Sequence, residues 1–231
     1  ADAAHGTAVR SRLKKAKNMK GILSLLRLQS AGRKHEREAA STDSGFFSSA
    51  FAGQEADPAR LVPWEARAVE VGAAHLGSAR GSKLLQALWG KDKYMAQLPA
   101  GAMQRLEKFF VFAQVQADRD VIRQDEYGNF MIVVLTGTIA VDRAQPWGEQ
   151  LHLAETRPGD ILGEMSLLDS GIRFSTCTTL SECEIAVLSA DALDDMMTQD
   201  PALAASLVAL LARKLSLRLR VVSTRLSDNQ P

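Results

Sequence analysis

Short segments with a two-residue apolar repeat, separated by turn residues, occupy residues 110–188 and restrict the fold more than any other feature of the sequence. This alternation is typical of β-strands with one buried face, and glycine-containing pairs between them mark turns. Many short strands at regular spacing indicate a closed sheet, so we expect a jelly-roll-like β-roll. The segments are 111–115, 130–135, 139–141, 151–153 and 185–187, and the turn pairs stand at 128–129, 136–137, 147–148 and 158–159.

Helical periodicity flanks this strand region on both sides. Before it, apolar spacing predicts helices over residues 64–76, 83–89, 93–98 and 102–109, the last with an apolar face that can dock on a sheet. After it, Ser189 and Ala190 cap a helix that runs through Met197, and Pro201 begins a longer helix to about Leu226. The expected fold class is therefore α+β, a β-roll with a helical N-terminal extension and a long C-terminal helix.

The chain divides into three predicted regions: a basic, partly disordered N-terminal arm (1–58), a helical region (59–110) and the β-roll with its C-terminal helix (111–231). In the arm, basic residues at 10–20 precede an apolar cluster at 22–28. Such a segment can remain a solvated arm, lie on anionic lipid, dock in a groove of a protein partner or touch nucleic acid electrostatically. Among the contacts, a protein partner is favoured because residues 10–29 contain no aromatic side chain.

Composition agrees with a small globular protein. The 231 residues are 46% hydrophobic, which suffices for a packed core, and no apolar run reaches transmembrane length. The basic start lacks the sustained apolar segment of a secretory signal. Cys177 and Cys183 lie in strand-like sequence without a nearby pair of histidines, which favours free buried thiols in a reducing compartment. We therefore expect a cytoplasmic protein.

Residues 158–176 combine residue types and spacing that describe a binding chemistry. Gly163 and Glu164 open an apolar run that allows one or two helical turns before residues 169–171 break it. A helix start presents unpaired N–H groups and partial positive charge, which favour an anion. Gly163 lets a ligand approach the backbone closely, and Arg173 can bring a planar fork of donors to the same place. The segment predicts a site for one phosphate.

Glu164 adds a second requirement to this site. A carboxylate beside a phosphate is repulsive unless it accepts hydrogen bonds from a neutral group, such as a ribose hydroxyl. A ligand that carries both a phosphate and a ribose is a nucleotide.

These residues resemble the cyclic nucleotide-binding domain, which is shared by the bacterial catabolite activator protein, the regulatory subunit of protein kinase A and cyclic nucleotide-gated channels. The resemblance covers residues 103–226 and is most specific from Gly163 to Arg173. It implies that Glu164 accepts from the ribose 2′-hydroxyl, that Arg173 pairs with the cyclic phosphate, and that backbone N–H groups from Gly163 to Met165 complete the cradle. It also implies that the C-terminal helix covers the base, with Arg218 near it, and pairs two subunits into a homodimer.

Phe174 departs from the family pattern, in which a small residue usually follows the arginine, and Ser175 comes next. The backbone N–H of Phe174 is retained, but its bulky side chain changes the rim of the pocket, and the threonine associated with cyclic GMP is absent. Alternatively, Glu164 and Arg173 pair with each other in a cassette that holds no ligand. For Arg218, stacking on a purine competes with a position on a solvated basic face of the helix.

Other function classes fit poorly. The chain ends at Pro231, so we expect no winged helix-turn-helix and no sequence-specific DNA binding. A metal enzyme of the cupin type needs two or three histidines and a carboxylate around one metal, and just His152 lies in the strand region. We therefore expect no enzyme, no metal and no cofactor other than the ligand itself.

The predicted function is that of a stand-alone bacterial sensor or adaptor. It binds a cyclic nucleotide, cyclic AMP or cyclic GMP, and signals to an unknown protein partner through movement of a helix. The alternative is a constitutive protein-interaction scaffold built on the same fold without a ligand.

Overall fold

A computed structural model describes residues 47, 61–92, 95–99 and 101–228 of the chain. The predicted basic arm, apart from residue 47, lies outside the described residues, and so do its proposed contacts with lipid, nucleic acid or a protein partner. The division into three regions stays a prediction.

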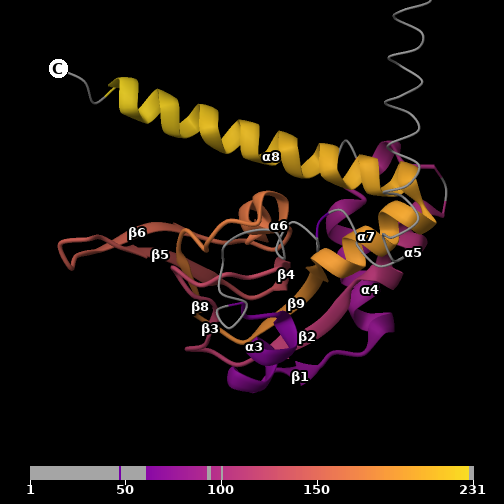
Figure 1. Cartoon of the computed structure of the whole chain (residues 1–231). Helices are drawn as coiled ribbons and strands as arrows, with labels where there is room; N and C mark the ends of the chain where they lie inside the picture. The colour runs from indigo at the N-terminus through magenta and orange to yellow at the C-terminus, as the bar shows by residue number, and fades with distance from the viewer. Residues whose placement is uncertain (1–46, 48–60, 93–94, 100, 229–231) are drawn as a thin grey trace, which may run out of the picture. The chain divides into compact units, whose positions relative to one another are not determined.

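Two antiparallel sheets form the β-roll (Figure 1). One sheet has five strands in the order β1-β2-β9-β4-β7, and the other has four in the order β3-β8-β5-β6. The strands are β1 (Ala74–His75), β2 (Val111–Val115), β3 (Asp120–Ile122), β4 (Phe130–Thr136), β5 (Ile139–Ala144), β6 (Gln150–Glu155), β7 (Ile161–Leu162), β8 (Thr176–Thr179) and β9 (Cys183–Ser189). All five predicted strands are confirmed: β2 has the predicted bounds, and the others differ by at most three residues at an end.

Strand β4 separates two apolar clusters of the core. Its residues Phe130, Ile132 and Val134 belong to the apolar cluster inside the roll, whereas the alternate residues of the strand belong to a second cluster packed against helices. Both faces are buried, so the strand reads as a continuous apolar run instead of an alternating one. Each fully buried aliphatic side chain contributes about 1.5–3 kcal/mol, so burial on both faces makes β4 a large contributor to the stability of the fold.

Four strands were not predicted: β1 lies within the predicted helix 64–76, and the other three are each short or polar. β7 has two residues, β3 has three, and β8 reads Thr-Cys-Thr-Thr, in which just Cys177 and Thr179 are buried. Cross-strand pairing with β5 holds β8 in place, and that information is absent from the local sequence.

The helices before the roll differ in part from prediction. They are α3 (Trp64–Glu70), α4 (Ser78–Trp89), the 3₁₀ turn η2 (Met95–Gln97), α5 (Ala102–Leu106) and the 3₁₀ turn η3 (Glu107–Phe109). The predicted helix 64–76 is wrong in its second half, because Gly72 adopts a left-handed φ of 65° and β1 then pairs with β2. The α4 helix begins five residues before the predicted residue 83, and residues 95–97 of the predicted helix 93–98 form a 3₁₀ turn.

Two helices follow the roll. Ser189 caps α7 (Ala190–Gln199) as predicted, with its hydroxyl accepting from the backbone N–H of Ala192 at 3.2 Å. Pro201 starts α8 (Pro201–Asp228), whose first half buries Leu203, Leu207 and Leu211 against the helix-packed cluster. None of the helices in the described part of the chain is both long and apolar enough to span a membrane.

Both cysteines are free and buried, which confirms that prediction. Burial raises the pKa of Cys177 to about 12 and also raises the pKa of Cys183. Both thiols therefore remain protonated and unreactive at neutral pH.

Candidate functional site

The predicted phosphate segment forms a tight turn and a short helix. Gly163 follows β7 with a left-handed φ of 76° and caps α6 (Glu164–Asp169), which ends at Ser170, also left-handed. A Cβ atom at Gly163 would lie 2.5 Å from the Arg173 Nη1 atom and 3.1 Å from the Phe130 carbonyl oxygen. Both the backbone conformation and the close approach of Arg173 therefore require glycine here. The short helix after Gly163 is confirmed.

Arg173 lies buried behind this turn, with 2% of its surface exposed. Its guanidinium donates to the Gly163 carbonyl oxygen at 2.9 Å and to the Phe130 carbonyl oxygen at 2.7 Å. The guanidinium carbon lies 4.6 Å from the centroid of the Phe130 ring. Gly128 is equally close, since a Cβ atom there would lie 2.5 Å from Arg173 Nε. Backbone carbonyls and an aromatic ring thus hold the arginine in one position.

The charge of Arg173 has no ion-pair partner within the described residues. Burial lowers the pKa of Arg173 to about 10, so the side chain still carries its positive charge at neutral pH. A buried charge without an opposite charge is costly for a folded protein. An anion bound beside Arg173 would compensate it.

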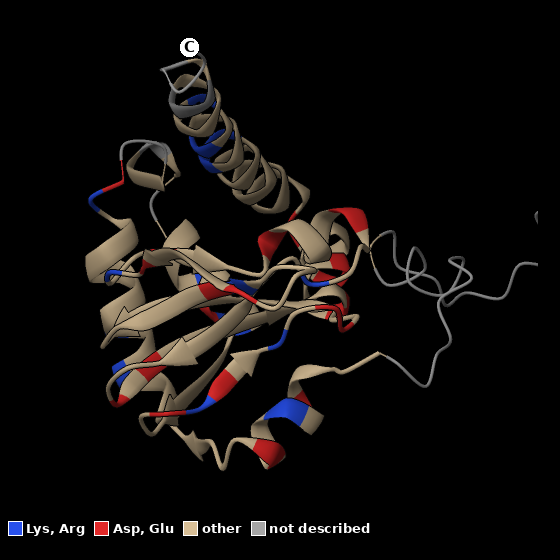
Figure 2. Ribbon diagram, turned by 90° about the vertical axis from the view of Figure 1, so that its left-hand side faces the viewer, with Lys and Arg blue, Asp and Glu red and all other residues tan. Residues whose placement is uncertain are grey.

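Glu164 is also buried, with 3% of its surface exposed, and its partner is Arg218 of α8. Arg218 Nη1 donates to Glu164 Oε1, and Nη2 donates to the Ile161 carbonyl oxygen at 2.8 Å. One turn earlier, Lys214 Nζ donates to the Gly159 carbonyl oxygen at 3.1 Å. Lys214 and Arg218 are two of several basic residues along α8 (Figure 2). Their hydrogen bonds hold the helix against residues 159–164.

Two side-chain arrangements considered from the sequence are not found among the described residues. Glu164 and Arg173 form no ion pair with each other, because each has different partners. Arg218 is not part of a purely solvated face, although 48% of its side chain is exposed, since it reaches Glu164. Its contact with a purine base stays a prediction.

The remaining predicted residues line the outer edge of the segment. Met165 and Phe174 are each about half exposed. The Phe174 ring lies beneath Arg143, whose guanidinium carbon is 3.9 Å from the ring centroid and whose Nη1 donates to the Phe174 carbonyl oxygen at 2.5 Å. Ser175, the next residue, is partly buried. The bulky ring therefore lies at the protein surface.

Sequence reasoning missed three contributors to the site. Gly128 was interpreted as a turn residue alone, and Phe130 as a strand residue alone, yet both contact Arg173. Arg143, at the end of β5, adds a second positive charge close to residue 174. None of the three has a local motif, so their positions follow from the closed sheet.

Comparisons with known proteins indicate which family the domain resembles. The sequence model of the cyclic nucleotide-binding domain family matches residues 112–200. The chain is 31% identical over 108 residues to the CRP-like cAMP-activated global transcriptional regulator of Mycobacterium tuberculosis, covering 47% of this chain and 46% of that protein. It is 31% identical over 97 residues to the cyclic AMP receptor protein of Thermus thermophilus, covering 42% and 45% of the two chains. The chain thus spans about half the length of the curated relatives it matches.

Solved structures show the same fold. A crystal structure of a cyclic nucleotide-binding domain from Methylobacillus flagellatus superposes with a TM-score of 0.63 at 23% identity, covering 69% of this chain and 90% of that chain. This likeness confirms the predicted β-roll with flanking helices.

Proposed function

Residues 112–200 belong to the cyclic nucleotide-binding domain family, and from this premise we propose that the chain is a cyclic nucleotide-responsive sensor or adaptor. It captures the cyclic phosphate at Arg173 and signals to a partner protein through α8. Its role is regulatory and not enzymatic, and its location is cytoplasmic.

The buried, uncompensated charge of Arg173 is the observation that carries this proposal. The guanidinium is held by two carbonyl oxygens and the Phe130 ring, which fix its position without neutralising it. A cyclic phosphate carries one negative charge and offers acceptor oxygens to such a donor. The backbone N–H groups at the start of α6 have no acceptors within the helix and complete the cradle.

Glu164 supplies the ribose contact. Its Oε1 atom accepts from Arg218, and a carboxylate has two oxygens with about four acceptor positions. The ribose 2′-hydroxyl can therefore share Glu164 with Arg218 instead of displacing it. When the ribose and Arg218 both contact Glu164, the ligand lies between α6 and α8. A bound ligand therefore tightens the contact of α8 with the roll.

Signalling requires that α8 differ between the free and bound states, because a ligand shifts only an equilibrium whose two states it binds differently. The exposed second half of α8 is suited to this change. Its first half is buried in the core, whereas the second half touches the roll through Lys214 and Arg218.

Cyclic AMP is the first ligand to test, because the names of both curated relatives include it. We expect titration calorimetry at neutral pH to give saturable heat with cyclic AMP, and cyclic GMP and cyclic di-GMP serve as comparisons. Binding of any one of these nucleotides supports the nucleotide site and identifies its ligand. Heat with none of the three would contradict the sensor proposal.

A constitutive scaffold is the second candidate. One observation favours it: without a ligand, Arg173 already has two carbonyl acceptors and Glu164 already has Arg218. In that case the cassette is a structural element, and partner binding is independent of nucleotides.

Homodimerisation through α8 is part of the proposal. Leu217, Leu219, Val221 and Val222 are all at least half exposed on the second half of the helix. Leu217 and Val221 share one face of the helix, and Leu219 and Val222 share another, so this half exposes a broad apolar surface that can pack against a second copy. We expect sedimentation to show a dimer, and Leu219→Asp, at the most exposed of these positions, to convert it to a monomer.

Ser216→Asp provides the matched control, because Ser216 is an exposed polar residue of the same helix. It should leave the dimer intact. A monomeric wild type, or equal dissociation by both variants, would contradict an α8 interface.

A further inference from the structure

The segment before the roll contacts the backbone that carries Arg173. The Val62 backbone N–H donates to the Tyr127 carbonyl oxygen at 2.8 Å, and Leu61 forms a parallel bridge with Tyr127. Tyr127 also forms an antiparallel bridge with Ile172. Residues 125–127 therefore lie between the N-terminal segment and the segment that ends in Arg173.

Backbone hydrogen bonds extend this ladder to Arg173 itself. The Arg173 N–H donates to the Glu126 carbonyl oxygen at 2.7 Å, and the Asp125 N–H donates to the Arg173 carbonyl oxygen at 2.9 Å. Whatever holds residues 125–126 in place thus also holds the backbone of Arg173.

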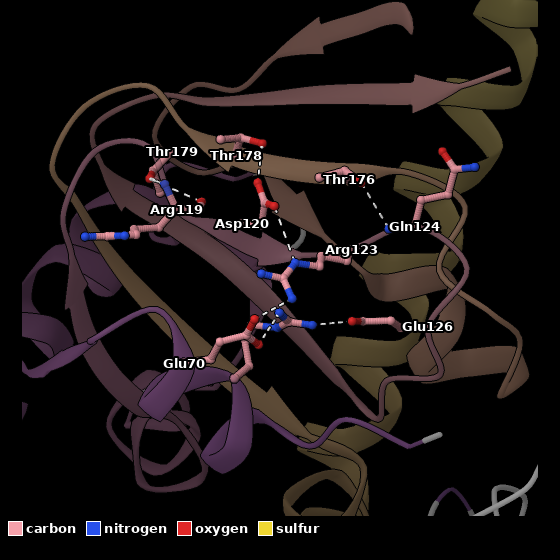
Figure 3. Close-up of polar contacts among 10 residues, drawn as sticks. Glu70, Arg119, Asp120, Arg123, Gln124, Glu126, Thr176, Thr178 and Thr179 are labelled. Carbon is pink, nitrogen blue, oxygen red and sulfur yellow. Dashed lines mark hydrogen bonds and ion pairs between the residues drawn. The ribbon is translucent and has the colours of Figure 1, made fainter. Parts of the chain in front are cut away.

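Helix α3 holds them through Arg67, which is 1% exposed. Arg67 Nη2 pairs with the Glu126 carboxylate, and Nη1 pairs with Glu70 at 2.6 Å. Glu70 also forms an ion pair with Arg123, and Arg123 forms another with Asp120 (Figure 3). This network connects α3 with the start and the middle of the loop that runs from β3 to β4, at Arg123 and Glu126.

Aromatic contacts form a second connection. Trp64 of α3 packs edge-on against Phe130, with ring centroids 5.6 Å apart and an interplanar angle of 67°. The same Phe130 ring lies under the guanidinium of Arg173, and all three side chains are buried. α3 therefore contacts both the loop and the ring that fix Arg173.

We propose that Arg67 and Trp64 of α3 are positioning residues for Arg173, so that docking of α3 and binding of an anion at Arg173 stabilise each other. The nucleotide part of this inference rests on the proposed function, whereas the positioning of Arg173 does not. Coupling of this kind is reciprocal, since the free energy is shared by the two sites. Helix α3 lies outside residues 112–200, which match the family model. The proposed coupling therefore involves a helix that precedes the matched domain.

The first test needs no ligand. Arg67→Met should speed amide hydrogen exchange at Asp125 and Arg173 by about tenfold or more relative to core amides of β4 and β9, because losing one partner of a buried ion pair is strongly destabilising locally. Arg80→Met is the matched control, since Arg80 of α4 pairs with Glu184 at 2.5 Å but has no contact with this loop. It should change those two amides by less than about twofold.

A second variant covers the case in which Arg67→Met does not fold. Glu126→Gln keeps the shape of the side chain, removes the charge and should speed the same two amides in the same direction. Equal exchange at Asp125 and Arg173 in the Arg67 and Arg80 variants, or equal acceleration of the whole core, would overturn the positioning role.

The reciprocal test uses 3′,5′-cyclic AMP. In the wild type, the nucleotide should slow exchange in residues 64–70, and Arg67→Met should weaken its affinity while Arg80→Met does not. Binding that leaves α3 exchange unchanged refutes the coupling. If the wild type binds no cyclic AMP, the proposed function fails, and the exchange at Asp125 and Arg173 still decides the positioning role.

Discussion

Arg173→Ala should lower the affinity for cyclic AMP by roughly ten- to a hundredfold. The substitution removes a charged hydrogen bond of about 1.5–3 kcal/mol. Since about 1.4 kcal/mol corresponds to a tenfold change in affinity, the loss converts directly into that range. Calorimetry on the variant, with its fold checked by circular dichroism, measures the effect.

Two further variants separate charge from packing. Arg173→Gln keeps a neutral donor near the Gly163 and Phe130 carbonyl oxygens but removes the positive charge, so its affinity should fall nearly as far. Arg143→Ala removes the neighbouring, partly exposed arginine over Phe174, and it should change affinity by a factor of about three or less because charges near the surface contribute little. Equal losses for Arg173→Ala and Arg143→Ala would show that the phosphate does not lie at Arg173.

The strand pattern and the phosphate segment could be predicted because both are local properties. Alternating or continuous apolar runs favour strands, and this was sufficient to locate β2, β4, β5, β6 and β9, although β6 is exposed along its whole length. Likewise, the glycine before a short amphipathic run correctly located the start of α6. Each signal depends on the residues that immediately surround it.

The partners of the site residues could not be predicted because they are distant in the sequence. Glu164 pairs with Arg218, 54 residues later, and Arg173 donates to Phe130, 43 residues earlier. The proximity of Glu164 and Arg173 in the chain favours an ion pair between them. In the fold, both side chains are directed to other elements by the sheet register and by the path of α8.

The end of α3 illustrates a tertiary override of local propensity. Residues 64–76 keep an apolar periodicity that suits a helix, yet Val71 and Gly72 end it and Ala74 pairs with Gln114 of β2. Extra pairing at the sheet edge outweighs the small helical preference of these residues. Within the short helix, Trp64 packs against Phe130 of β4 and Arg67 pairs with Glu126 of the loop next to Arg173.

Arg218→Met should weaken cyclic AMP binding by about fivefold and reduce the protection that the ligand gives to α8. The half-exposed Arg218–Glu164 pair contributes about 1 kcal/mol, and in the bound state it closes the helix over the shared carboxylate. In the wild type, hydrogen exchange at residues 210–222 should slow when cyclic AMP is added. In Arg218→Met the slowing should be smaller, because the contacts of α8 with Glu164 and with the Ile161 carbonyl oxygen are lost.

Arg220→Met is the matched control for this experiment, since Arg220 is exposed on the same helix and forms no ion pair with any described residue. Arg220→Met should bind cyclic AMP with the affinity of the wild type, and the ligand should slow hydrogen exchange at residues 210–222 to the same extent. Tighter binding by Arg218→Met would mean that Arg218 competes with the ribose for Glu164, so the ligand would release α8 instead of closing it. Unchanged exchange at residues 210–222 in the wild type, with binding established by calorimetry, would exclude α8 as the signalling element, because an element that responds to a ligand must differ between the free and bound states.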